Sequence, residues 1–281
     1  MSKRRLIVIL LAAIGLFAPL EAQQFRQPPP YRILITNDDG VRAPGLAAVA
    51  QALQAIGSPI VVAPADNQTG KGHSIVTTEP VFRQDLTLPN GLPAIGLTAT
   101  PASTVNIAIR NILMPRPDLV VSGVNPGYNF GHSVHMSGTV GAARMAAMLG
   151  VPAISISQDA AAFQKEMVFA AEEAIWVARR VKAYGLPAGT FLNVNVPPMP
   201  AGGYKGYMIT SQANSRGGEE SFAEEKNPQG RTVYWNLWKE GGTAGDGTDM
   251  WAVANGWVSV TPMRVDGTDP AQFEALKSIF K

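Results

Sequence analysis

Two adjacent carboxylates, Asp38 and Asp39, are the side chains in this 281-residue chain that most strongly indicate chemistry. They follow an apolar run at 33–35, and polar clusters with glycine follow later apolar runs in the same way, at 66–70 and 122–125. An Asp-Asp-Gly string also suits a turn or a helix cap, and taken alone it favours a turn. If the apolar runs are parallel strands, however, all three polar ends meet at one sheet edge, where open α/β sheets bind ligands.

The three polar clusters offer carboxylates, a hydroxyl and an amide carbonyl, which together form an all-oxygen set. Hard cations such as Mg²⁺, Mn²⁺ or Ca²⁺ suit such ligands, whereas zinc and copper prefer nitrogen and sulfur. The chain has no cysteine, which excludes disulfides, thiolate metal sites and cysteine nucleophiles. The coincidence of three clusters therefore predicts a site for a hard divalent cation.

A second signal concerns anions. Ser137, Gly138 and Thr139 directly precede an alanine-rich segment, where a serine or threonine caps a helix. The same geometry exposes backbone N–H groups and the positive end of the helix dipole, which suits phosphate. Asn129 lies just upstream and can supply an amide donor. A cation with oxygen ligands facing such a helix end would hold a phosphate ester.

Other catalytic signatures are weak in this sequence. The three histidines are His73, His132 and His135, and a solvated loop position explains His73 at least as well as a catalytic role. There is no Gly-x-Ser-x-Gly elbow, no P-loop and no Gly-x-Gly-x-x-Gly string. These absences argue against serine-hydrolase and dinucleotide-binding chemistry.

The elements that must position these residues alternate between strands and helices. Strands are predicted at 33–35, 60–63, 119–121, 153–156 and 191–196, and helices at 45–56, 103–113, 139–149 and 163–184. Strand–helix–strand order implies parallel pairs with helical crossovers. The strands are continuous apolar runs, which indicates cover on both faces. We therefore predict an α/β fold, a three-layer sandwich around a mostly parallel sheet.

The character of the chain changes at residue 197, after which prolines and glycines form a loop. Strands are predicted at 207–210, 232–238 and 257–261, an irregular polar segment at 213–230, and a helix at 270–280. This half is interpreted as an antiparallel extension of the core. The folded part is thus predicted as one domain over 31–281, with a core at 31–196 and an extension at 197–281.

The N-terminus has the pattern of a secretory signal. Lys3, Arg4 and Arg5 precede an apolar run at 6–20, which predicts a signal peptide at 1–22. A proline-rich linker at 23–30 follows. The run is short for a membrane span, so export, to the periplasm, is favoured over an uncleaved anchor, with cytoplasmic residence as the alternative. The net charge of +2 gives no reason to expect nucleic acid as a partner.

Several ordered motifs together resemble one family. The resemblance is carried by residues 33–45, 62–64, 67–70, 73–75, 115–125, 137–140, 248–249 and 256–262. Within residues 31–266 the chain is similar to the SurE family, whose members are metal-dependent 5′/3′-nucleotidases. The resemblance implies a Rossmann-like core and a C-terminal extension that often exchanges between subunits. It also implies a homodimer or homotetramer.

The resemblance implies a role for individual residues as well. Metal ligands would be Asp38, Asp39, Thr69 and Asn125, and they would hold one divalent cation per subunit, Mg²⁺ or Mn²⁺. The phosphate would be held by Asn129, Ser137, Gly138 and Thr139. Asp38 or Asp39 would also accept the proton of the attacking water. The sequence does not separate those two roles.

The chain departs from the family pattern at Ser103, His132, Met136 and Met145. All four implied metal positions keep an oxygen ligand, which favours a phosphomonoesterase acting on nucleoside 5′- and 3′-monophosphates, with short polyphosphate as a further substrate. The departures motivate the alternative, an exported nucleotide- or phosphate-binding protein with little or no turnover.

The base-binding surface is less well marked in the sequence. Tyr128 and Phe130 are candidates for stacking on a base, as are aromatic residues of the 232–238 segment. Within that segment Tyr234, Trp235 and Trp238 are interpreted as core or subunit-interface residues, because aromatic side chains dominate both settings.

Overall fold

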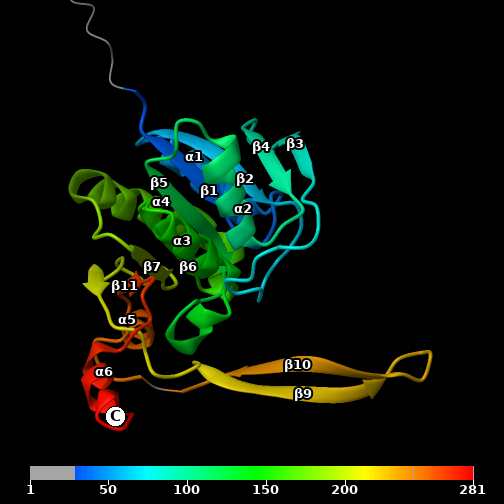
Figure 1. Cartoon of the computed structure of the whole chain (residues 1–281), viewed down its shortest axis with the longest axis vertical. Coiled ribbons are helices and arrows are strands. Elements are labelled where there is room, and N and C mark those ends of the chain that lie inside the picture. The colour runs from blue at the N-terminus through cyan, green and yellow to red at the C-terminus, as the bar shows by residue number, and fades with distance from the viewer. Residues whose placement is uncertain (1–28, 243, 281) are drawn as a thin grey trace, which may run out of the picture.

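The computed structural model describes residues 29–242 and 244–280 (Figure 1). The predicted signal peptide at 1–22 and most of the predicted linker lie outside these residues. No helix in the described part of the chain is both long enough and apolar enough to cross a membrane.

A large mixed sheet forms the centre of the molecule. Its strands, in chain order, are β1 (Arg32–Thr36), β2 (Ser58–Pro64), β3 (Arg83–Thr87), β4 (Pro93–Leu97), β5 (Leu119–Pro126), β6 (Ala153–Gln158), β7 (Thr190–Val196), β8 (Tyr207–Ile209) and β11 (Val258–Arg264). Their order across the sheet is β3-β4-β2-β1-β5-β6-β7-β11-β8, and the central strands from β4 to β7 are parallel. The predicted parallel core is confirmed.

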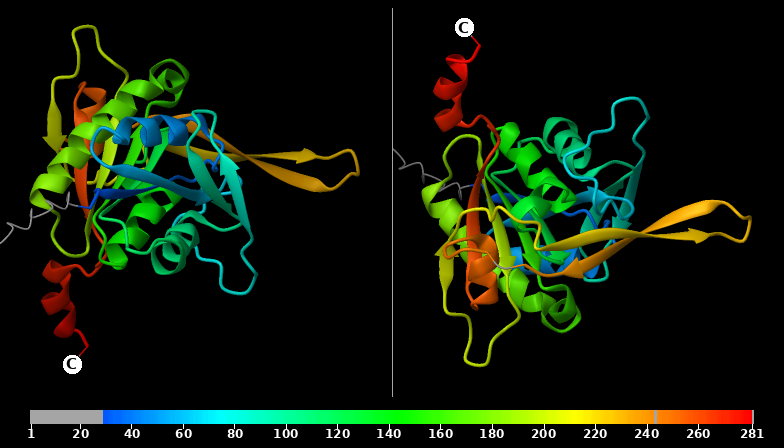
Figure 2. Two further views of the ribbon diagram at one scale, coloured as in Figure 1. Left: turned by 90° about the horizontal axis from the view of Figure 1, so that it is seen from above. Right: turned by 90° about the horizontal axis from the view of Figure 1, so that it is seen from below.

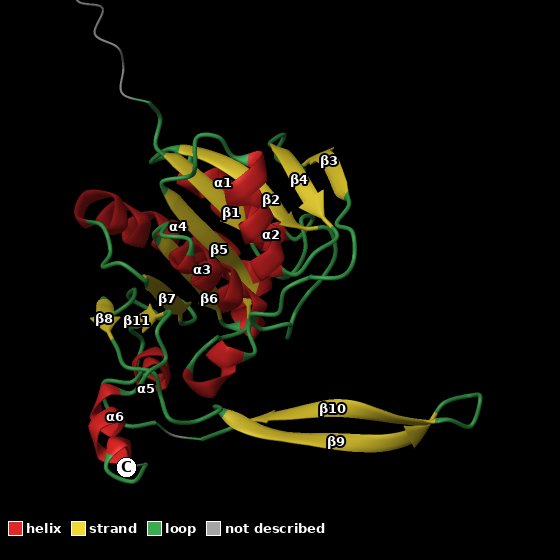
Figure 3. Cartoon of the chain, in the orientation of Figure 1, coloured by secondary structure: helices red, strands yellow, loops and turns green. Residues whose placement is uncertain are grey.

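Helices cover both faces of this sheet, as Figure 3 shows. They are α1 (Pro44–Leu53), α2 (Pro101–Ile107), α3 (Gly138–Met148), α4 (Ala160–Tyr184) and α5 (Asp249–Ala254), whereas the last helix, α6 (Pro270–Lys277), has no buried residue and lies apart from the sheet (Figure 3). A π-helical turn, η1 (Ala108–Ile112), continues α2, and a 3₁₀ turn, η2 (Gly131–His135), precedes α3. The three-layer α/β sandwich expected from the sequence is therefore present.

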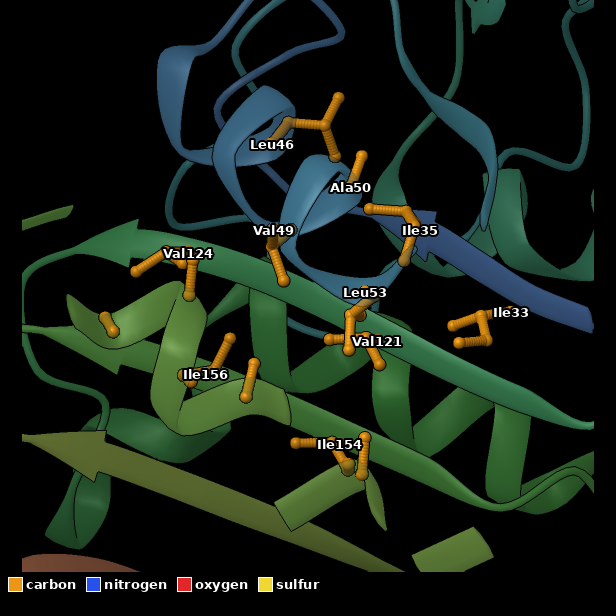
Figure 4. Close-up of a cluster of buried hydrophobic side chains, with 14 of the residues drawn as sticks. Ile33, Ile35, Leu46, Val49, Ala50, Leu53, Val121, Val124, Ile154 and Ile156 are labelled. Atoms are coloured by element: carbon orange, nitrogen blue, oxygen red, sulfur yellow. The ribbon is translucent and has the colours of Figure 1, made fainter. Parts of the chain in front are cut away.

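Two hydrophobic clusters hold the layers together, and successive strand residues alternate between them. Ile33 and Ile35 of β1 pack with α1 and α4, whereas Leu34 packs with α2 and α3 on the other face. Figure 4 shows the first cluster, in which α1 residues such as Leu46 and Val49 lie over the sheet. Because both faces are covered, the strands need apolar residues at every position, which produces the continuous apolar runs.

The parallel register aligns the ends of the central strands. β1 pairs with β2 on one side and with β5 on the other, and Thr36 at the end of β1 lies opposite Ser122 of β5. The chain segments that follow β1, β2 and β5 therefore leave the sheet at the same edge. This is the convergence that the polar clusters predicted.

The C-terminal extension contains a long two-stranded arm that projects from the body (Figures 1 and 2). The arm consists of β9 (Gly218–Lys226) and β10 (Thr232–Glu240), paired antiparallel over their full lengths. The prediction of an irregular segment at 213–230 is wrong, because β9 obtains its conformation from pairing with β10 rather than from an apolar pattern of its own. Strands β3 and β4 and helix α5 also had no counterpart in the prediction.

The extension is not purely antiparallel, which corrects the expectation. β11 runs antiparallel to β7 but parallel to β8. The arm is antiparallel, yet its aromatic side chains are not in the core of the chain: Tyr234 is 64% exposed and Trp235 is 59% exposed. The core interpretation of these aromatics is therefore wrong for the single chain.

Candidate active site at the strand ends

The segment that follows β1 makes a tight turn against the segment that follows β2. Asn37 Nδ2 donates to the Gly40 carbonyl (3.0 Å), and the Asp38 carbonyl accepts from the Gln68 N–H (2.6 Å). Gly40 has a φ of 105°, and a Cβ there would lie 3.1 Å from the carbonyl carbon of Asp66. Only glycine allows this approach, which holds the Asp38–Asp39 pair beside the end of β2.

Asp38 is almost fully buried at the N-terminus of α3. Its Oδ1 accepts a hydrogen bond from Thr139 Oγ1, and the backbone N–H groups of Gly138 and Thr139 also stabilise its charged form. A Cβ on Gly138 would lie 2.7 Å from the Asp38 Cβ, so this position has room for glycine alone. The helix end that the sequence associates with phosphate therefore holds the first of the two carboxylates.

The two aspartates share an environment that opposes their charges. Burial raises the pKa of Asp39 to about 7, and the neighbouring Asp38 charge adds to this shift. Burial also raises the pKa of Asp38, although the hydrogen bonds from α3 oppose the effect. Two adjacent carboxylates kept out of water in this way need a positive charge nearby.

The oxygen atoms around the pair fit a hard cation. Asp39 Oδ2 and Asn37 Oδ1 are buried and have no hydrogen-bond partner among the described residues. The buried hydroxyls of Thr36, at the end of β1, and of Ser122, its partner within β5, likewise have none in the described structure. Within residues 29–242 and 244–280 no three His, Asp or Glu side chains group closely enough to hold a metal, so a cation here depends on amide and hydroxyl oxygens as well.

The two remaining implied metal ligands follow the neighbouring strands. Thr69 is exposed in the loop after β2, and its N–H donates to Asn67 Oδ1 (2.8 Å). Asn125 is buried near the end of β5, and its Nδ2 donates to the Gly127 carbonyl (2.7 Å). The described structure contains no hydrogen bond from either residue to the aspartates. Because β1, β2 and β5 are parallel neighbours, Thr69 and Asn125 still lie at the same edge of the sheet as the aspartates.

The residues implied for phosphate binding have structural partners of their own. Asn129 is buried, and its Nδ2 donates to Ser157 Oγ (2.8 Å), while Asn193 and Asn195 of β7 bond its backbone. Ser137 Oγ caps α3 by accepting from the Val140 N–H (3.1 Å). The first N–H groups of α3 have partners as well, because those of Gly138 and Thr139 bond Asp38 and that of Val140 bonds Ser137 Oγ.

A cleft of about 840 Å³ is lined by the chain neighbours of Asn129, although the aspartates and the other implied ligands are not among its lining residues. One wall is formed by Tyr128 and Phe130, whose rings stack at 5.1 Å, together with Met136. Arg216, which lies just before β9, and Trp238 of β10 also line the cleft. This aromatic cleft has the size and apolar lining of a small-molecule site.

The sequence did not reveal the role of Asp249, which is fully buried in the extension. Its Oδ2 accepts from the Gly131 N–H (2.9 Å), and its Oδ1 accepts from the Ala213 N–H (2.9 Å). Asp249 thereby fastens the extension to η2, which forms part of the cleft wall. Its membership in the 248–249 motif was the available signal, but the partners lie far away along the chain.

The histidines lie near the site without forming a catalytic dyad. The solvated interpretation of His73 holds only in part, because the residue is partly exposed but its Nε2 is buried and has no hydrogen-bond partner among the described residues. Burial and the nearby Arg144 charge lower the pKa of His73. His132 Nε2 instead bonds Asn214 Oδ1 (2.8 Å).

The protein thus has an open α/β fold, with a pair of aspartates at the carboxyl edge of its sheet as the candidate site. The family model "Survival protein SurE" matches residues 33–219, and the chain belongs to the SurE family. Proteins named 5′-nucleotidase SurE from Geotalea daltonii and Syntrophotalea carbinolica are 39% and 41% identical to it. These matches cover 88% and 87% of this chain, and 98% and 95% of the relatives.

A further relative and a solved structure agree. The protein named 5′-nucleotidase SurE 1 from Thermus thermophilus is 40% identical, over 89% of this chain and 98% of the relative. The crystal structure of the SurE protein from Aquifex aeolicus superposes with a TM-score of 0.75 at 35% identity. That match covers 89% of this chain and all of the Aquifex chain, so the fold resemblance extends through the C-terminal extension.

Proposed function

We propose that this protein is a divalent-metal-dependent phosphomonoesterase that converts nucleoside 5′- and 3′-monophosphates to nucleoside and phosphate. Relatives covering most of the chain are named 5′-nucleotidases, which supports the reaction class. The observation that carries the proposal is the Asp38–Asp39 pair: Asp38 is buried against the N-terminus of α3, and the buried Oδ2 of the partly exposed Asp39 has no partner in the described structure. Short polyphosphate is a further candidate substrate.

The proposed metal ligands are Asp38, Asp39, Thr69 and Asn125, holding one Mg²⁺ or Mn²⁺ per chain. Such an ion supplies Lewis-acid stabilisation of the phosphoryl oxygens and lowers the pKa of a water. Asp38 is fixed by Thr139 and α3, so it acts as an oriented group. Asp39 Oδ2 is the oxygen available to bind the cation or to hold a proton.

The cleft provides a place for the rest of the substrate. We assign Asn129, Ser137, Gly138 and Thr139 to the phosphate end, where the N-terminus of α3 favours negative charge. The stacked Tyr128 and Phe130 rings line the cleft next to Asn129, which supports binding of a planar base there.

The test is phosphate release from AMP and from 3′-AMP, with Mn²⁺, with Mg²⁺ and with EDTA. We expect release that depends on the metal and is lost in Asp39→Asn. Asp85→Asn, which changes an exposed aspartate on β3, is the matched control and should keep full activity. Metal binding without release from these or other phosphate esters would favour a nucleotide-binding protein instead.

We further propose export to the periplasm and assembly into a homodimer or homotetramer. The N-terminal sequence pattern supports export, and the exposed aromatic side chains of the arm support assembly. Fractionation of cells that produce the full chain tests the location. Light scattering tests the assembly, and a mass equal to one chain would refute it.

A further inference from the structure

A second pocket, of about 670 Å³, is separate from the aromatic cleft. Its walls come from three stretches of sequence: His135 and Arg144, then 210–212, then 261–267. It shares no lining residue with the cleft, although both touch the segment around η2, since Ser133 and Met136 line the cleft and His135 lines this pocket. We name it the Arg144 pocket.

Arg144 is an unusual arginine for its position. It is partly buried on α3, and this burial lowers the pKa of its guanidinium. Its guanidinium lies 5.8 Å from the centre of the Phe191 ring, but no hydrogen bond or ion pair to it occurs within the described structure. Removing a guanidinium from water without an anion is costly, so this side chain is suited to receive one.

Most other polar groups of the pocket are already hydrogen-bonded to one another or to the backbone, which leaves the arginines as its donors. Gln212 Nε2 lies 3.3 Å from His135 Nε2 and donates to the Gly131 carbonyl (2.8 Å). Arg264 contributes a second guanidinium at the exposed rim, where its nearest acid is Asp266 at 3.7 Å. The hydroxyls of Thr210 and Thr261 bond each other at 2.7 Å. With two arginines and one carboxylate, the pocket retains a positive charge.

We propose that the Arg144 pocket binds a phosphate group, either as inorganic phosphate or as the phosphate of a small ester, at a site distinct from the strand-end aspartates. The planar guanidinium of Arg144 matches two phosphate oxygens at once, and Arg264 adds a second positive charge to the lining. The volume exceeds that of a bare anion, which leaves room for the organic part of an ester. This inference does not depend on the proposed nucleotidase activity.

Isothermal titration of the protein in EDTA tests the site, with inorganic phosphate in one arm and glycerol phosphate in the other. Sodium chloride at matched ionic strength controls for screening. Arg144→Met should weaken phosphate binding about tenfold or more, since a hydrogen-bonded charge pair is lost. Arg179→Met, which changes an exposed arginine on α4 over the opposite face of the sheet, should leave binding unchanged.

Circular dichroism confirms that each variant is folded. If Arg144→Met does not fold, Arg264→Gln replaces it, because that side chain is 69% exposed and its removal leaves the core intact. We expect Arg264→Gln to weaken binding several-fold. Equal binding by wild type and Arg144→Met, or by wild type and Arg264→Gln, would overturn the proposal, as would a wild-type signal no larger than that of chloride. Tighter binding of the ester than of phosphate would identify the ester as the ligand.

Discussion

The carboxyl end of β1 and the β9–β10 arm obtain their structures in different ways. At the end of β1, buried strands on both sides and the N-terminus of α3 fix Asp38 and Asp39 within a packed core. The arm has almost no such surroundings, and its strands pair only with each other while Phe222, Tyr234 and Trp235 stay exposed. The difference indicates that the edge is built to position groups and the arm to meet another surface.

The largest expected effect tests whether every residue of the C-terminal extension contributes as little to the core as the arm does. Asp249 lies in the extension, yet it is buried as deeply as the core. Asp249→Ala leaves the N–H groups of Gly131 and Ala213 without an acceptor, and we expect a loss of about 3 kcal/mol in the free energy of unfolding. Urea denaturation measures it, and a loss below about 1 kcal/mol would contradict the role assigned to this carboxylate.

The same residue predicts a dependence on pH. Burial raises the pKa of Asp249 above its ordinary value of 3.8, so the folded protein binds this proton more tightly than the unfolded chain does. The contribution of Asp249 to the free energy of unfolding is therefore present at low pH. It is lost as the pH rises from 3.8 through the raised pKa of the folded state. The free energy of unfolding of wild type, measured relative to that of Asp249→Asn, should therefore fall over that range. A difference that is constant with pH would show that the carboxyl is not perturbed.

At the strand edge, Gly138→Ala should damage activity more than stability. The new Cβ would lie 2.7 Å from the Asp38 Cβ and 2.9 Å from its Oδ2, so it displaces the carboxylate. We expect metal-dependent kcat/KM to fall about a hundredfold. Gly245→Ala, where a Cβ meets nothing within 4 Å, is the matched control. Similar activity of the two variants would contradict the packing described here.

The arm offers a paired test of which of its side chains serve the cleft. Trp238 lines the cleft, whereas Trp235, on the same strand, does not. Trp238→Ala should raise KM for AMP about fivefold by removing about 1 kcal/mol of contact, while Trp235→Ala leaves KM unchanged. Steady-state kinetics of both variants decide the matter. Equal KM values would assign the cleft wall to other residues.

The smallest expected effect concerns the arm as a whole. Replacing residues 219–239 with a short glycine linker should change the free energy of unfolding of a single chain by less than about 1 kcal/mol, since these side chains are largely exposed. The oligomeric mass should fall in the same variant, which light scattering measures. An unchanged mass would move the proposed subunit interface away from the arm.

The sequence predicted the strand edge well because local patterns decide it. Each central strand is a short apolar run that ends in a polar cluster, and parallel connections then bring Asp38, Thr69 and Asn125 to one edge. The cap at Ser137 was equally local. The assignment of α3 to phosphate stays a prediction, and the bond from Thr139 to Asp38 could not be predicted because it depends on how α3 packs.

The arm and the role of Asp249 could not be predicted in this way. β9 is rich in glutamate and lacks an alternating apolar face, so its strand conformation depends on register with β10. The sequence around Asp249 shows no local pattern that marks its role, and the Gly131 N–H that it binds lies 118 positions away in the chain. Pairing and long-range burial are properties of the folded chain, which no local pattern encodes.

Mn²⁺ binding followed by electron paramagnetic resonance tests the central claim most directly. The account predicts one Mn²⁺ per chain in wild type, affinity at least about tenfold weaker in Asp39→Asn, and unchanged affinity in Asp85→Asn. Wild-type affinity in Asp39→Asn would contradict the account, because the buried oxygen of Asp39 would then have no part in holding the ion.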